Sequence, residues 1–282
     1  MNFVADYVRI LRPINIIISA GTVLVCADIL NAFENIFLLF STIFIVGLFI
    51  GGANIFNDIQ DKNEDKINKP NRPIAAEHIS LKAAGNYAKV LFISGAGMCF
   101  FLPLSATLLV WFIVFPLMIV YSLKLKSTPL AGNGVIAFLL GLTFLFCGLV
   151  FEDIVPMIIP AVLAFSLTFV RELTKDIEDI EGDKRSGLNT FPIMLGLNKA
   201  VQLVILLSVT TGILSFIPYL LKLYSAFYLI PLVLGVELPL AIVVFSFMKS
   251  YSRSTARKSS ILLKTATIMG IISIYTGATI GV

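Results

Sequence analysis

At positions 57–73 the chain reads NDIQDKNEDKINKPNRP, a charged segment that directly follows a long apolar run and carries two prolines near its end. If its first part continues the preceding run as a helix, Asn57, Asp61 and Asp65 recur every four residues and lie along one face. Carboxylates at this spacing repel one another, so the acidic face calls for a compensating cation. A second acidic set repeats the arrangement further along the chain: Asp176, Asp179 and Asp183. We therefore expect a fold that brings two acidic helix faces together.

The composition indicates an integral membrane protein. Hydrophobic residues make up 58% of the 282 residues and charged residues only 13%, and the mean hydropathy is +0.96. Soluble domains carry about 25% charged residues, whereas runs of roughly 20 apolar residues, which recur in this chain, can cross a bilayer as helices. Three cysteines lie inside these runs at unrelated spacings, which supports neither a disulfide framework nor a zinc site.

Nine apolar segments predict nine transmembrane helices, and with them an all-α bundle. Lys and Arg residues fall almost entirely in the loops on one side of these segments, and the opposite loops hold only Lys222. By the positive-inside rule, the N-terminus and the acidic motifs face the cytoplasm, in a multi-pass protein of the plasma membrane. We expect Met1–Asn15 to lie on the membrane surface as a lead-in to the first span. The predicted spans are residues 15–32, 35–56, 82–102, 104–123, 133–151, 155–175, 198–220, 226–248 and 259–280.

These spans are expected to form a single transmembrane domain over residues 1–282. The acidic motifs follow the second and the sixth predicted span, which suggests two four-helix halves, residues 1–126 and 127–250, with a ninth helix added. The net charge of +4 is spread over short loops between spans, so no nucleic-acid partner is expected. The predicted surroundings are the lipid bilayer, and no obligate protein partner is inferred.

Paired carboxylates near basic residues indicate chemistry on a diphosphate. A Mg²⁺ ion takes one or two carboxylates, several waters and phosphate oxygens, so a diphosphate fits between two acidic faces. Basic side chains beside the motifs could neutralise a leaving diphosphate. Ionisation of an allylic diphosphate, whose long tail lies in an apolar bundle, is the reaction that this combination suggests. The basic residues are Lys69 and Arg72 near the first motif, Lys184 and Arg185 near the second, and Lys124 and Lys126 after the fourth span.

The motifs resemble those of the UbiA superfamily of intramembrane prenyltransferases. Asn57, Asp61 and Asp65 match the family's NxxxDxxxD signature, and the segment DIEGD at Asp179–Asp183 is similar to its DxxxD motif. Asp176 is an additional upstream carboxylate. Tyr121-Ser122 with Lys126 resembles the tyrosine-and-lysine loop after the family's fourth helix. The resemblance covers the whole chain in motif order, topology and length.

Within the superfamily, residues 65–74 and 175–185 most resemble the branch that assembles archaeal ether lipids. That resemblance implies geranylgeranyl diphosphate as the donor and the hydroxyl of geranylgeranylglyceryl phosphate as the acceptor, so that the product gains its second ether bond. The alternatives are prenyl transfer to an aromatic quinone precursor or to a chlorophyll-type carboxylate. A metal or solute carrier is a further alternative, but a carrier would place its ionisable groups near the bilayer midplane instead of at one surface.

The resemblance also implies residue roles. Arg72 and Lys126 donate to the diphosphate, and the ring or phenol oxygen of Tyr121 stabilises the allylic cation. The candidates for binding the acceptor phosphate are Arg12, Lys69, Lys124 and Arg185. The candidates for the base that takes the hydroxyl proton are Asp58, Asp176 and the released diphosphate. The expected Mg²⁺ ligands, of which Asp61, Asp65, Asp179 and Asp183 are also expected to be catalytic, are Asn57, Asp61, Asp65, Asp176, Asp179 and Asp183.

Three features outside the motifs carry structural expectations. The pair Gly47 and Gly51 lets the second predicted span approach a neighbour closely. Glu237 lies deep in an apolar run, and we expect it to have a structural partner because Pro239 bends that helix. The single histidine, His78, is expected at the surface, where it ligates nothing.

Overall fold

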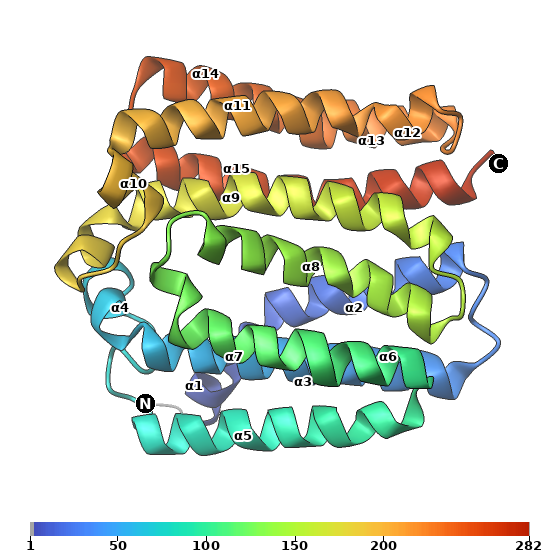
Figure 1. The fold of residues 1–282 in the computed structure, drawn as a ribbon, viewed down its shortest axis with the longest axis horizontal. Helices are drawn as coiled ribbons and strands as arrows, with labels where there is room; N and C mark the ends of the chain where they lie inside the picture. Colours follow the sequence, from blue (N-terminus) through green and yellow to red (C-terminus); the bar gives the residue numbers. More distant parts are fainter. Residues whose placement is uncertain (1–2, 282) are drawn as a thin grey trace. The chain divides into compact units, whose positions relative to one another are not determined.

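The computed structural model describes residues 3–281, which form helices and connecting turns but no strand (Figure 1). Met1 and Asn2 of the predicted surface lead-in lie outside the described residues. Contacts divide the chain into two compact units, which differ in their boundaries from the halves expected from sequence. The first comprises Met1–Leu125, Phe146–Ile154 and Glu181–Gly187, and the second comprises Lys126–Leu145, Val155–Ile180 and Leu188–Val282. The single domain with two four-helix halves stays a prediction.

The first unit contains the helices that carry the first acidic motif. A π-helical turn, Val110–Val114, joins its last two helices, which together form one continuous segment. The helices are α1 (Phe3–Ile10), α2 (Pro13–Ile29), α3 (Ile36–Gln60), α4 (Lys62–Asn68), α5 (Leu81–Met98), α6 (Leu104–Leu109) and α7 (Phe115–Leu123).

Glycines allow α3 to pack closely against its neighbours in the first unit, where α2, α5 and α7 all contact it (Figure 1). A Cβ added at Gly51 would lie 3.0 Å from a methyl group of Leu11, and one added at Gly52 would lie 2.9 Å from the Phe92 ring. At Gly47 the nearest atom would be a methyl group of Ile16, at 3.4 Å. The predicted close approach is confirmed at Gly51, whereas a Cβ at Gly47 would make only an ordinary van der Waals contact.

A sharp break separates α1 from α2, which are bent by 51° relative to each other. Leu11 and Arg12 lie between them, and Arg12 has φ 54 and ψ 69, a left-handed conformation that costs a residue other than glycine roughly 1–3 kcal/mol. The next residue, Pro13, further restricts Arg12 toward extended backbone. The surrounding structure must therefore hold this break in place.

The described residues of the second unit also form helices and connecting turns, without a strand. A second π-helical turn, Val233–Glu237, precedes Pro239. Helix α9 also extends into the first unit through residues 181–185, and α8 does so through residues 146–150. The helices are α8 (Ala131–Val150), α9 (Ile158–Arg185), α10 (Phe191–Leu195), α11 (Leu197–Ser215), α12 (Ile217–Leu220), α13 (Leu229–Leu232), α14 (Leu238–Lys249) and α15 (Arg253–Thr279).

Glu237 has the structural partner expected from sequence. The Ser215 hydroxyl donates to Glu237 Oε1 at 2.7 Å, and the Tyr228 hydroxyl donates to the Ser215 carbonyl oxygen at 2.7 Å. A Cβ at Gly212 would lie 2.6 Å from Glu237 Oε2, so this glycine makes room for the carboxyl. The acidic group thus joins the C-terminal end of α11 to the π-helical turn before α14.

The chain is a multi-pass membrane protein. Within residues 3–281, seven helical segments are long and apolar enough to cross a bilayer, and the bent pair Val4–Ile10 and Pro13–Ile29 gives an eighth if it counts as one span. The third predicted span, at α5, is not among them, because Lys82, Asn86 and Lys89 make its first half polar. Nine spans therefore stay a prediction. The seven are Ile36–Gln60, Leu104–Leu123, Ala131–Val150, Val155–Arg185, Leu197–Leu220, Ala226–Lys249 and Arg253–Thr279.

Candidate active site

The first acidic motif lies along one helical face, as its spacing predicts. Helix α3 ends at Gln60, yet the hydrogen bonds of a helix continue through Asp61 into α4. The amide of Asp61 donates to the Asn57 carbonyl oxygen, that of Asp65 to Asp61, and that of Lys69 to Asp65, each at 2.8 Å. Asn57, Asp61 and Asp65 are therefore stacked by backbone bonds at every fourth residue.

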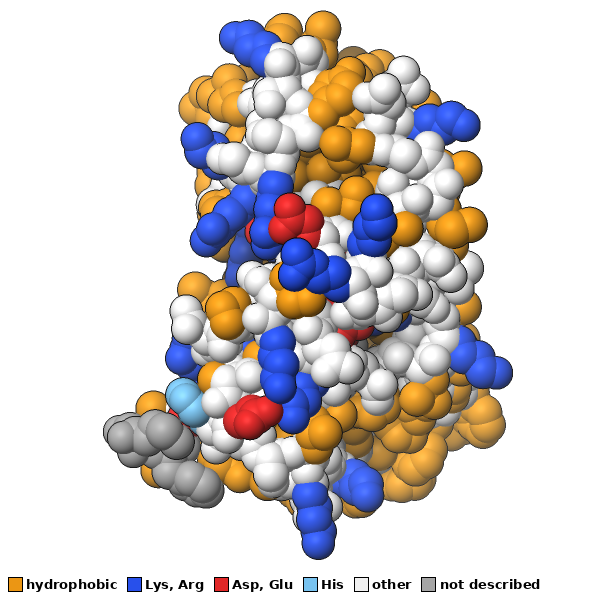
Figure 2. Space-filling model, turned by 90° about the vertical axis from the view of Figure 1, so that its left-hand side faces the viewer, with side chains coloured by type: hydrophobic (Ala, Val, Ile, Leu, Met, Phe, Trp, Pro, Cys, Tyr) orange, Lys and Arg blue, Asp and Glu red, His pale blue; other side chains and the backbone are white. Residues whose placement is uncertain are grey.

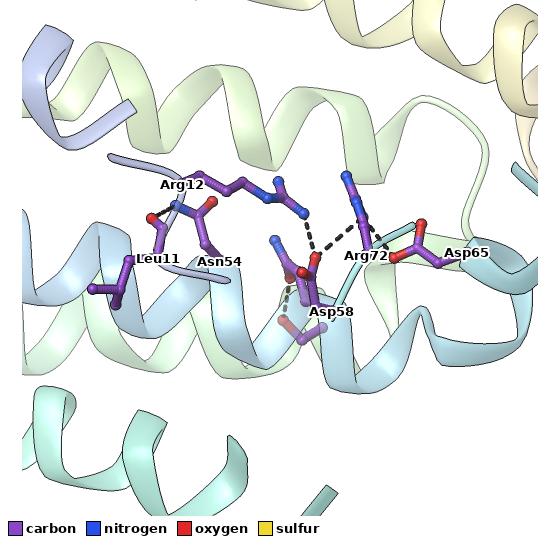
Figure 3. A network of polar contacts seen from close by, with 8 residues as sticks. Leu11, Arg12, Asn54, Asp58, Asp65 and Arg72 are labelled. Carbon is purple, nitrogen blue, oxygen red and sulfur yellow. Dashed lines mark hydrogen bonds and ion pairs between the residues drawn. The ribbon is translucent and has the colours of Figure 1, made fainter. Parts of the chain in front are cut away.

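Two guanidinium groups meet at one buried carboxylate beside this face (Figure 3). Arg12 Nη2 donates to Asp58 Oδ1. Arg72 Nη1 donates to the same Asp58 oxygen at 3.1 Å and to Asp65 Oδ2 at 2.6 Å. The Asp58 side chain is only 3% exposed and that of Asp65 only 5%. Carboxylates this deeply buried need such partners, because an unpaired buried charge is costly.

Burial and pairing act in opposite directions on these ionisable groups. Burial raises the pKa of the Asp65 carboxyl above its ordinary value, although Arg72 lowers it in part. Burial lowers the pKa of the Arg72 guanidinium, but the charges of Asp58 and Asp65 outweigh this effect and raise the pKa overall. Arg72 therefore remains a fixed cation next to the acidic face, where an anionic ligand would be attracted.

The carboxamide of Asn57 is oriented by the end of α7. The Ser122 hydroxyl donates to Asn57 Oδ1 at 3.1 Å. Sequence reasoning emphasised Tyr121 next to it, whose side chain is half-buried, and did not assign a role to Ser122. Because the bond joins residues 65 positions apart in sequence, only the fold reveals it.

The second motif is divided between the two units. In the first unit, Asp183 is buried, and a Cβ at the preceding Gly182 would lie 2.1 Å from Asn68 Nδ2 at the end of α4. In the second unit, Asn133 Nδ2 donates to Asp176 Oδ2 at 2.9 Å. The tail of the second motif therefore packs on the helix that carries Asp65.

A charged cluster upstream of the second motif escaped sequence reasoning. Glu172 accepts from Arg171 Nη1 and from Lys175 Nζ, both at 2.9 Å, on one segment of α9. Arg171 was not singled out because it sits inside a predicted apolar span. The sequence signal for this cluster is the pair Arg171 and Lys175, four residues apart and directly before the second acidic motif.

The predicted site residues fall into both units. Arg72 contacts Asp65 directly, and Asp58 joins Arg12 to Arg72. The roles of these residues in binding and catalysis stay predictions. Figure 2, which looks onto the end of the ribbon where α4 lies, shows several Lys and Arg side chains and a few acidic ones at the surface. The first unit holds Arg12, Asn57, Asp61, Asp65, Lys69, Arg72, Tyr121, Lys124, Asp183 and Arg185, and the second holds Lys126, Asp176 and Asp179.

The chemistry of the donor set fits Mg²⁺. Among the described residues, no three Asp, Glu, His or Cys side chains are arranged to hold a metal ion by themselves. Mg²⁺ does not require such a cage, because it takes one or two carboxylates and completes its shell with waters and substrate phosphates. The first motif offers the oxygens of Asn57, Asp61 and Asp65 and no sulfur or imidazole.

Comparison with known sequences gives full-length relatives. A profile of the UbiA prenyltransferase family matches residues 16–268. A protein of Methanosphaera stadtmanae named digeranylgeranylglyceryl phosphate synthase is 35% identical over 272 residues, which cover 96% of this chain and 98% of that protein. A protein of the same name from Methanothermobacter thermautotrophicus is 34% identical over 272 residues, covering 96% and 95%.

Solved structures share the fold. One, described as giving insight into digeranylgeranylglyceryl phosphate synthase in membranes, matches with a TM-score of 0.75 and 29% identity over 99% of both chains. A UbiA homologue from Archaeoglobus fulgidus bound to GPP and Mg²⁺ matches with a TM-score of 0.64 and 18% identity, covering 95% of this chain and 99% of that one. The second likeness, at this low identity, concerns the fold alone.

Proposed function

Since the chain belongs to the UbiA prenyltransferase family, we propose that it transfers a geranylgeranyl group from geranylgeranyl diphosphate to the hydroxyl of geranylgeranylglyceryl phosphate. The product carries the second ether bond of an archaeal membrane lipid. The observation that carries this proposal is the full-length similarity to proteins named digeranylgeranylglyceryl phosphate synthase. The same similarity favours this acceptor over an aromatic quinone precursor or a chlorophyll-type carboxylate.

The site geometry supports a reaction between two phosphorylated substrates. Both substrates carry phosphate, so a binding site needs cations at more than one position. Arg72 lies against Asp65 of the first motif, and Arg12 lies on the other side of Asp58. An aromatic acceptor without a phosphate would need only one such cationic position.

The proposed reaction breaks one C–O bond and forms another. The bond between the prenyl C1 and the diphosphate breaks, and the electron pair leaves with the diphosphate. The acceptor hydroxyl oxygen then bonds to C1 and loses its proton, for which the released diphosphate is the favoured base, because both guanidinium groups already occupy Asp58. Arg72 and Lys126 bind the leaving diphosphate, and Tyr121 faces the allylic cation, which the apolar helices shield from water.

Mg²⁺ is the proposed cofactor. When bound, it neutralises charge on the diphosphate and so makes it a better leaving group. Its proposed ligands in the first unit are Asn57, Asp61, Asp65 and Asp183. In the second unit the sequence adds Asp179 and, as a further candidate, Asp176. This donor set would hold the ion together with substrate oxygens, as Mg²⁺ sites with few carboxylates do.

A direct test uses purified protein with radiolabelled geranylgeranyl diphosphate, Mg²⁺ and geranylgeranylglyceryl phosphate. We expect a new labelled lipid, its loss on addition of EDTA, and its return when excess Mg²⁺ is added back. A parallel reaction with 4-hydroxybenzoate tests the aromatic alternative. Transfer to the aromatic compound but not to the lipid phosphate would overturn the proposed acceptor, and no transfer to either would overturn the enzyme.

The proposed topology has nine spans, with the N-terminus and both motifs at the cytoplasmic face of the plasma membrane. The asymmetry of Lys and Arg between the loops supports it. Single cysteines introduced at Lys66 and Lys222, in a variant without the three native cysteines, would be treated with a membrane-impermeant maleimide in intact cells. Labelling is expected at position 222 and not at position 66, and the reverse would overturn the orientation.

A further inference from the structure

The break between α1 and α2 is held by two side chains of α3. Asn54 Nδ2 donates to the Leu11 carbonyl oxygen at 2.9 Å, and Asp58 accepts from the side chain of Arg12 (Figure 3). Asn54 and Asp58 are one helical turn apart, so they lie on the same face of α3. Both are buried, with exposed fractions of 7% and 2%. The left-handed Arg12 is thus fixed through its preceding carbonyl and through its own guanidinium.

One oxygen of Asp58 sets the distance between two cations. Its Oδ1 atom accepts from both Arg12 Nη2 and Arg72 Nη1. Two guanidinium groups would otherwise repel each other, so the shared carboxylate keeps them together at a fixed separation. The Arg12 and Arg72 side chains are 30% and 23% exposed, and each guanidinium has five N–H donors, more than these contacts use.

The two cations differ in what else they touch. Arg72 also donates to Asp65, so it belongs to the acidic motif that is expected to bind the donor's diphosphate. Among the contacts of the described residues, Arg12 is linked to that motif through Asp58, and it is the N-cap residue of α2. A strained backbone that several contacts hold in place is typical of a functional position. Arg12 therefore offers a second cationic position, separate from the donor side.

We infer that Asp58 is a positioning residue that holds Arg12 for the phosphate of the acceptor and Arg72 for the diphosphate of the donor. This assignment rests on the proposed function, and it selects Arg12 from the residues that are candidates for binding the acceptor phosphate. The shared carboxylate keeps the two phosphates apart while it holds the acceptor hydroxyl and the prenyl C1 within one site. Asp58 acts through the two arginines and does not touch either substrate.

The inference predicts effects that separate the two substrates. Arg12→Gln should raise the KM for geranylgeranylglyceryl phosphate roughly 10–100-fold, the loss expected for a charge-assisted hydrogen bond, and leave the KM for geranylgeranyl diphosphate within about 2-fold. Asp58→Asn should raise both values, because both guanidiniums lose their anchor. Asn54→Ala removes only the contact with Leu11, so it should raise the acceptor KM alone.

A substrate without phosphate gives a second, independent readout. The wild-type protein should prefer geranylgeranylglyceryl phosphate to the unphosphorylated alcohol, and Arg12→Gln should lose most of this preference. Arg12→Lys, which keeps the charge but not the planar fork, should restore part of it. A purely structural role for Arg12 would lower turnover of both acceptors equally and leave the preference intact.

The experiment measures both KM values for the full-length chain in lipid nanodiscs, with gel filtration to confirm monodisperse protein. If Asp58→Asn does not fold, Arg12→Gln and Asn54→Ala still read the acceptor side. Equal increases of both KM values in Arg12→Gln, or an unchanged donor KM in a folded Asp58→Asn, would overturn the inference. The proposed function fails separately, if the wild-type protein does not use geranylgeranylglyceryl phosphate. In that case the KM for geranylgeranyl diphosphate, measured with whichever acceptor the protein uses, still tests whether Asp58 positions Arg72.

Discussion

Replacing Gly182 by alanine tests whether the two motifs depend on each other. Gly182 lies within the second motif and packs on the side chain of Asn68, the last residue of α4. An added Cβ would lie 2.1 Å from Asn68 Nδ2 and 2.6 Å from its Cγ, both too close for any real contact. Either the Asn68 side chain rotates away or α4 shifts. A shift of α4 would also move Asp65, which lies about one helical turn before Asn68.

Two opposing effects set the size of the change in stability. Alanine favours a helix over glycine by about 0.8–1 kcal/mol, so Gly182→Ala without a clash would stabilise α9. Overpacking costs about 1–3 kcal/mol, and this cost outweighs the gain in helix propensity when the contact is this short. We therefore expect a net destabilisation of up to about 2 kcal/mol. Activity should fall about 10-fold or more, since a displacement on the order of 1 Å at a reacting group can cost about 100-fold.

The assay compares thermal unfolding and transfer rate across a double-mutant cycle. Asn68→Ala removes the clashing amide, so the double variant Asn68→Ala with Gly182→Ala should recover to within about 3-fold of Asn68→Ala alone. Gly85→Ala is the matched control, because a Cβ at this helical position of α5 meets no atom within 4 Å. It should be neutral or slightly stabilising. Wild-type activity of Gly182→Ala, or a double variant no better than the single one, would refute the reasoning.

Three further substitutions test the first motif. Asp61→Asn should abolish turnover while the protein stays monodisperse in detergent; activity near wild type would remove Asp61 from the site. Arg72→Leu leaves Asp65 without the cation that lowers its pKa, so the pKa rises further above its ordinary value. A raised carboxyl pKa gives stability that is present at acid pH and lost as pH rises through the folded-state pKa; the variant's melting temperature should therefore fall by several degrees at pH 7 and recover toward pH 4. Ser122→Ala removes the donor to Asn57 and should raise the Mg²⁺ concentration needed for half-maximal activity about 3–10-fold, with unchanged melting temperature.

Local patterns were sufficient to predict most helices and the face of the first motif. The spacing of Asn57, Asp61 and Asp65 is a property of one helix, and the backbone bonds through Asp61 preserve it. Packing through Gly51 could also be predicted, because a small residue in an apolar helix indicates close approach whatever the partner. The span at α5 is harder to predict from its own residues, since their polar side chains weaken the apolar signal.

The contacts that organise the site could not be predicted from local patterns. Asp58 meets Arg12 across 46 positions of sequence and Asn57 meets Ser122 across 65. From the sequence alone, a basic residue such as Arg12 is explained by membrane orientation or by substrate binding. Neither explanation implies that it shares a carboxylate with Arg72. The left-handed backbone at Arg12 was also hidden, because an arginine before a proline normally indicates an extended residue.

Contacts at corresponding positions in the two parts of the chain bear on the expected internal repeat. Asn54 bonds the carbonyl of Leu11, and Asp176 bonds the carboxamide of Asn133; both members of the second pair lie the same distance, about 120 residues, after those of the first. By this correspondence Asp176 is equivalent to Asn54, whose side chain links α3 to the segment before α2, and Asp179 is equivalent to Asn57 of the first motif. Asp176→Asn should then keep activity within about 5-fold of wild type, because a carboxamide can still accept from Asn133, whereas Asp179→Asn should abolish it. Equal loss of activity and of Mg²⁺ affinity in both variants would instead make Asp176 a metal ligand, as the acidic spacing alone suggests.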